Sequence, residues 1–88
     1  MLTNAEHPVA WAMLMYELTD AHEHLGELIA QINAAGEIDE PDFAVFLGHV
    51  FAHLNRAWHG RNDPNLDQLS DEKFIEHNQF PTDLKPIG

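Results

Sequence analysis

The sequence predicts an all-α fold: an antiparallel helical hairpin with a short third helix and an extended C-terminal tail. Apolar residues recur at intervals of three and four along two long segments, as in helices that pack lengthwise. Only a few residues, the first of them a glycine, separate these segments, and so short a connection makes two helices antiparallel neighbours. The 88 residues, 44% of them hydrophobic, suit a single helical domain.

The first helix is expected over residues 8–35. Pro8 suits the first helical position, where its missing N–H costs nothing, and Gly36 suits the left-handed stop after the last turn. Thr3 and Glu6 have the spacing of a capping box just before it. The predicted packing seam consists of the positions Trp11, Leu14, Leu18, Ala21, Leu25, Leu28, Ile32 and Ala35.

The second helix is expected over residues 40–61. Asp39 is the predicted N-cap, and Ile38 is expected to pack on Phe43 as a hydrophobic staple. Pro64 follows the expected end of the helix. A broad apolar face is formed by Phe43, Phe46, Leu47, Val50, Phe51, Leu54, Ala57 and Trp58.

A short third helix is expected over residues 71–77. Ser70 is its predicted N-cap, and Leu69 is placed to pack on Phe74. Residues 78–88 contain two prolines, which disfavour helix in the residues before them, so this tail is expected to be extended.

The segment of residues 9–16 is apolar on every side of its helix, so one partner helix cannot cover it. We expect the C-terminal segment to fold back over it with Leu66, Leu69, Phe74, Ile75 and Phe80. We also expect two hairpins to associate as a four-helix-bundle homodimer. The residues expected at a partner or dimer interface are Trp11, Met13, Met15, Tyr16 and Trp58.

The net charge of the chain limits the classes of partner that it can bind. Fifteen acidic residues against four Lys and Arg give a net charge of −11, which repels phosphate backbones, so we expect no nucleic-acid binding. We expect a non-enzymatic interaction or regulatory module, in which an acidic surface steers a protein partner and an apolar helical patch supplies affinity.

The apolar stretch of residues 9–16 is far shorter than the roughly 20 residues that span a bilayer, and no positively charged segment precedes it. The chain contains no cysteine, which is typical of a reducing compartment. We therefore expect a soluble cytoplasmic protein that does not contact a membrane.

The position of the turn predicts contacts across the hairpin. If the turn is centred between residues 36 and 39, residues whose numbers sum to about 75 lie at the same level. This rule places Arg56 near Asp20 and His59 near Glu17.

The competing hypothesis is a metal-binding helical bundle. His49 and His53 are one turn apart on one helix face, and the same rule places His22 opposite His53. Such a site would hold a divalent transition metal such as zinc, with Glu23, or Asp20 and His24 on an adjacent stripe, to complete or orient it. The only serine, Ser70, is expected to serve as a cap, so a serine nucleophile is not expected.

Overall fold

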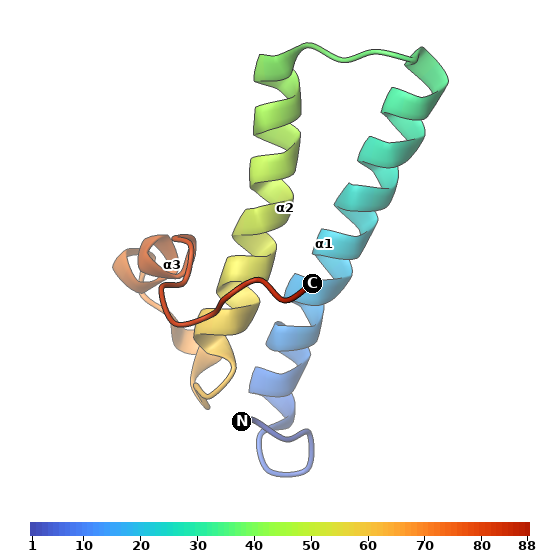
Figure 1. The fold of residues 1–88 in the computed structure, drawn as a ribbon. Helices are drawn as coiled ribbons and strands as arrows, with labels where there is room; N and C mark the ends of the chain where they lie inside the picture. The colour runs from blue at the N-terminus through green and yellow to red at the C-terminus, as the bar shows by residue number, and fades with distance from the viewer.

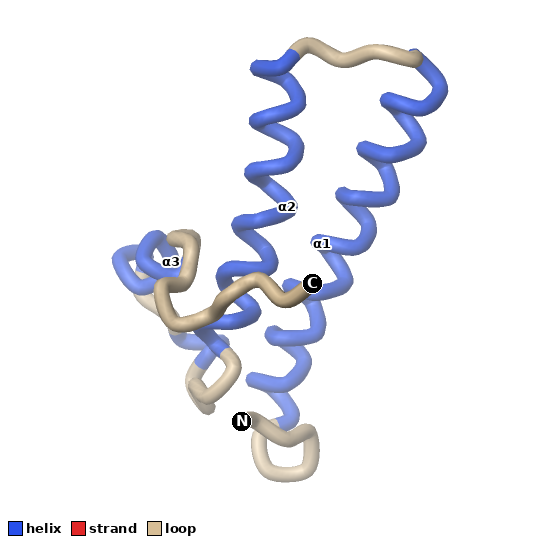
Figure 2. The backbone as a smooth tube through the Cα atoms, in the orientation of Figure 1, coloured by secondary structure: helices blue, strands red, loops and turns tan.

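The computed structural model describes residues 1–88 and confirms the all-α fold (Figure 1). Helix α1 spans Pro8–Ala35, α2 spans Glu40–Gly60 and α3 spans Asp71–His77, with a short 3-10 helix, η1, at Leu66–Gln68. The first two helices form the antiparallel hairpin, and α3 lies beside the end of α2 that is farther from the turn (Figure 2). None of the helices combines the length and the hydropathy that a bilayer span requires.

Local signals set the helix ends. Gly36 adopts a left-handed conformation with φ of 73°, and its N–H donates to the Ile32 carbonyl at 2.8 Å. Ser70 Oγ accepts from the Lys73 backbone N–H at 3.1 Å. Asp39 occupies the N-cap position of α2, but its side chain makes no capping hydrogen bond.

Two details near the helix ends differ from expectation, although α1 begins at Pro8 as predicted. Thr3 Oγ1 accepts from the Glu6 N–H at 3.2 Å, but residues 4–6 form a separate turn ahead of α1. Helix α2 ends at Gly60, one residue early, because the chain turns back there toward η1. A side chain at Gly60 could not fit this turn, since its Cβ would lie 2.6 Å from Leu66 Cδ2.

The main cluster of buried apolar residues lies at the end of the hairpin away from the turn, and Ala21, Leu28 and Val50 are buried farther along the α1–α2 contact. Leu66 of η1 and the half-buried Leu69 pack against the first turns of α1, as expected for the fold-back. The expected cover is incomplete, because Ile75 is 61% exposed and Phe80 is 65% exposed. The core cluster consists of Leu2, Ala10, Leu14, Ala57 and Leu66.

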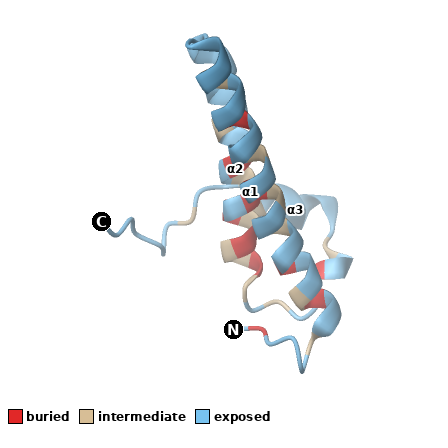
Figure 3. Ribbon diagram, turned by 90° about the vertical axis from the view of Figure 1, so that its right-hand side faces the viewer, coloured by how far each residue is buried: buried red, intermediate tan, exposed pale blue.

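The turn half of the hairpin, residues 29–49, contains no buried residue (Figure 3). The two helices diverge toward the turn in Figure 1, which opens the space between them. The radius of gyration is 14.8 Å, against about 12 Å for a compact chain of this length. Two residues of the predicted seam, Leu18 and Leu25, are 41% and 40% exposed.

Replacing Leu66 with alanine should lower the free energy of unfolding by about 2–3 kcal/mol, because burial is lost and a cavity remains. Urea unfolding followed by circular dichroism measures this change. Ile75→Ala is the matched control and should change the same free energy by less than about 0.5 kcal/mol, because Ile75 is exposed. Equal losses in the two variants would contradict the packing of η1 on the hairpin.

His77 at the end of α3 is half-buried, and its Nδ1 is buried without a hydrogen-bond partner. Burial, and then the His59 imidazole stacked on it at 5.5 Å, lower the pKa of His77 from its usual 6.5. The folded chain therefore resists a proton that the unfolded chain accepts.

The contribution of His77 to stability should be present above pH 6.5 and be lost as the pH falls through the lowered pKa of the folded state. We expect the fall in melting temperature between about pH 7.5 and about pH 5 to be smaller in His77→Asn than in the unsubstituted protein. Thermal unfolding at the two pH values measures this difference. An equal fall in both proteins would mean that His77 titrates normally.

Candidate functional site

The residues predicted for a partner interface do not form one surface. Trp11 is half-buried against the core, and the Trp58 Nε1–H donates to Asp83 Oδ1 at 2.9 Å. Met15 and Tyr16 are exposed, whereas Met13 lines a hollow on the side of α3. Successive helical residues differ by about 100° in direction, so a run of apolar residues is divided among different sides of α1.

A continuous apolar surface lies instead along one side of the hairpin. Its members, each 37% to 54% exposed, follow helical spacings of three, four, seven or eight residues on each helix. We call it the apolar face: Leu18, Leu25 and Ile29 of α1 with Phe43, Phe51 and Leu54 of α2. From the sequence, five of these six residues, all but Ile29, are expected on the faces that pack within the hairpin. Helical spacing predicts that residues share a face, but it does not predict whether that face is buried.

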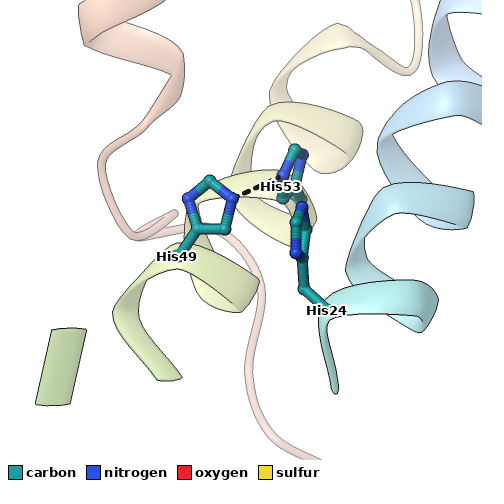
Figure 4. Close-up of side chains that lie close together, drawn as sticks. All are labelled: His24, His49 and His53. Atoms are coloured by element: carbon teal, nitrogen blue, oxygen red, sulfur yellow. Dashed lines mark hydrogen bonds between the residues drawn. The ribbon is translucent and has the colours of Figure 1, made fainter. Parts of the chain in front are cut away.

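The other side of the hairpin carries a cluster of three histidines, here called the histidine cluster: His24, His49 and His53. Figure 4 shows their rings converging from α1 and α2. One potential ligand atom from each lies within 4.8 Å of the others. The Nε2 atoms of His49 and His53 are 3.3 Å apart, and the His24 ring stacks on the His53 ring at 5.3 Å.

The structure brings two of the three predicted ligands together and replaces the third. His49 and His53 meet as expected, but His22 is exposed and lies outside the cluster, where His24 takes its place. Residues 22 and 24 lie at nearly the same height along α1. Their side chains nevertheless point in directions about 200° apart, because each residue of an α-helix adds about 100°. His24 had been expected only to complete or orient the site, together with Asp20, from an adjacent stripe.

Glu17 and Arg56 form a partly buried ion pair beside the cluster. Arg56 Nε donates to Glu17 Oε2 at 2.8 Å, and its Nη1 donates to Asn78 Oδ1 at 2.6 Å. Arg56 therefore pairs with Glu17, one helical turn before the predicted partner, Asp20.

The predicted contact of His59 with Glu17 is also replaced. His59 Nε2 lies 2.9 Å from the Gln79 carbonyl, to which it can donate, and the His59 ring stacks on His77. His59 therefore contacts Gln79, in the segment after α3, and not Glu17 of α1 as predicted.

The protonation of His49 follows from its surroundings. Desolvation, and then the charges of His53, His24 and Arg56, lower the pKa of His49 from its usual 6.5, while Asp20 raises it by less. The His49 imidazole is therefore neutral at pH 7, with one ring nitrogen free to accept a hydrogen bond or to bind a cation.

His53 Nδ1 lies between two groups with opposite requirements. It is 3.2 Å from Glu17 Oε2, to which it can donate, and 2.9 Å from Arg56 Nη2, from which it can accept. The two bonds need different tautomers, so only one forms at a time. With the hydrogen on Nδ1, the Nε2 lone pair faces His49.

The ion pair should couple α1 to α2. Glu17→Gln and Arg56→Gln should each lower the free energy of unfolding by about 1–3 kcal/mol, because each leaves a partly buried charge unpaired. The double variant should lose less than the sum, with a coupling of at least about 1 kcal/mol in urea unfolding.

The exposed pair of Lys73 and Glu76, with side chains 63% and 59% exposed, is the control for this double-mutant cycle. Its coupling should stay below about 0.5 kcal/mol, because solvent screens it. If the losses at Glu17 and Arg56 were simply additive, the interaction between them would be refuted.

Comparison of this chain with protein-family models, curated proteins and solved structures finds no match. The functional interpretation therefore depends on the two surfaces described above, the apolar face and the histidine cluster.

Proposed function

We propose that the protein acts as a homodimer in which the apolar faces of two hairpins pack together as a four-helix bundle, in a non-enzymatic protein–protein interaction role. The observation that carries this proposal is the turn half of the hairpin, which has no buried residue in the single chain. Two of its large apolar side chains, Ile29 and Phe43, belong to the apolar face and are 54% and 37% exposed. Helices gain most of their stability from packing, so a second copy supplies what this half lacks.

The accessible surface of the chain supports one dimer contact. A folded monomer of 10.0 kDa is expected to expose about 5,200 Å². This chain exposes 6536 Å², an excess of about 1,300 Å². Stable interfaces bury about 800 Å² on each partner, and permanent homodimers often bury more. The excess therefore matches the area that one such interface removes.

The distribution of charge favours a second copy of this chain as the occupant. Residues 28–36 and 43–55 contain no Asp, Glu, Lys or Arg, and the acidic residues of the turn half, Glu37, Asp39, Glu40 and Asp42, lie at the turn itself. The acidic residues of α1 lie on another side of the helix, at Glu17, Asp20, Glu23 and Glu27. Two chains of net charge −11 can thus meet through the apolar face without bringing like charges into the contact.

The C-terminal tail begins at the edge of the apolar face. The Phe80 ring packs on the Phe51 ring with centroids 5.2 Å apart, and Asp83 accepts from the Trp58 Nε1–H before the end of the chain projects away from the hairpin (Figure 3). Ile87 is 98% exposed. In the proposed dimer, this arm has an apolar surface within reach on the second copy.

The acidic residues of α1, Glu17, Asp20, Glu23 and Glu27, form a stripe that lies outside the proposed interface. Two such stripes on one dimer would attract a partner protein with a basic surface, mainly by raising the rate of encounter. In the proposed role, two copies of the chain assemble through the apolar face, and the dimer then binds a basic partner protein through its acidic surface.

Light scattering coupled to size exclusion should give a mass of about twice the 10.0 kDa of one chain. Ile29→Glu should shift this mass to that of a monomer, because it places a charge in the apolar interface. Val45→Glu is the matched control: Val45 is more exposed, at 69% against 54%, and lies outside the apolar face, so the dimer should persist.

A monomer mass for the unsubstituted protein would overturn the proposal, as would dissociation by Val45→Glu alone. Should Ile29→Glu fail to fold, dilution of the unsubstituted protein decides the matter. The melting temperature of a dimer falls on dilution, whereas that of a monomer does not change.

A further inference from the structure

The histidine cluster has the composition of a transition-metal site. His24 comes from α1, and His49 and His53 come from successive turns of α2. Neutral imidazoles are common ligands for zinc, copper, nickel and iron, and three protein ligands plus one open position is a recurrent arrangement. Residues from both helices meet here only because the hairpin has formed.

The spacing of the ring nitrogens fits a tetrahedral ion. Zn–N bonds of about 2.0–2.1 Å place two ligand nitrogens about 3.3–3.4 Å apart. The Nε2 atoms of His49 and His53 are 3.3 Å apart, which is long for a hydrogen bond but matches this edge. The widest separation in the cluster, 4.8 Å, must close by about 1.5 Å, a side-chain movement open to the half-buried His24.

Carboxylates stand behind two of the three rings. Glu17 Oε2 is 3.2 Å from His53 Nδ1, and Glu27 Oε2 is 3.7 Å from His24 Nδ1. Glu17 can hold the hydrogen on His53 Nδ1 and leave Nε2 free to bind, as in many metal sites, whereas 3.7 Å is too long for a hydrogen bond from His24 to Glu27. Arg56 keeps its bonds to Glu17 and Asn78 in either tautomer of His53, so the ion pair persists when Nδ1 carries the hydrogen.

The cluster is open to solvent on one side. His24 and His49 line a groove of about 520 Å³ between α1 and α2, together with Glu27 and Gln31. This groove gives an ion a route of entry and leaves room for a water molecule as the fourth ligand. His53, at the inner end, is buried at 7% exposure and is held in place by Glu17.

The geometry points to a binding site for one divalent transition-metal ion of the zinc class, held by Nε2 of His49 and His53 and by a ring nitrogen of His24. Glu17 orients His53. The site lies on the side of the α1–α2 contact away from the apolar face, so its occupation does not depend on the proposed dimer.

Calorimetric titration of the tag-free, chelator-treated full chain with Zn²⁺ tests this site. We expect one ion per chain and a higher melting temperature, because the ion binds the folded state. His53→Gln should weaken the site by at least about 100-fold, and Glu17→Gln should weaken it by about 10–100-fold. Binding of Co²⁺ should give the visible absorption of a tetrahedral complex.

His22→Gln is the matched control, since it removes an exposed histidine of the same helix from outside the cluster. It should bind Zn²⁺ like the unsubstituted protein. If His53→Gln does not fold, as judged by circular dichroism, His24→Gln replaces it, because His24 is less buried. Absence of one-to-one binding, or equal weakening by His22→Gln and the cluster variant, would overturn the assignment.

Discussion

The arrangement of the three helices depends on Arg56. From α2 its guanidinium reaches Glu17 on α1 at 2.8 Å and Asn78 at the end of α3 at 2.6 Å, and it lies over the Phe74 ring at 4.7 Å. A planar group with several donors can hold three elements at once, which an ammonium group does less well. The same contacts place Glu17 against His53, so the ion pair that joins the helices also orients the histidine cluster.

The hairpin is stabilised unevenly along its length. Near the chain start, Leu2 and Leu66 close a small core, and the Leu2 N–H donates to the Arg61 carbonyl at 2.8 Å. Toward the turn, no apolar residue is fully buried within the chain, and the helices separate (Figure 1). The apolar face and the histidine cluster lie on opposite sides of the α1–α2 contact. The proposed dimer contact and the proposed metal site therefore lie on different surfaces of one small fold.

The level rule found the correct height of most contacts but not their side. Pairs such as Glu17 with Arg56 and His24 with His49 lie close to the expected register. The rule could not choose between His22 and His24, because the rotation of each helix about its own axis decides which side chain enters the contact. That rotation is set by packing over the whole helix, including Leu2 and Leu66, which lie outside the hairpin.

The sequence by itself determined the all-α fold, the three helices and their ends, because these depend on local chemistry: apolar spacing, Pro8, the left-handed Gly36 and the Ser70 cap. Tertiary structure alone decided which apolar residues are buried and which form the apolar face. It also decided that η1 and Leu2 complete the core, and that His24 joins His49 and His53. Helix ends follow from neighbours in the chain, whereas burial and side-chain convergence depend on the directions of residues far apart in it.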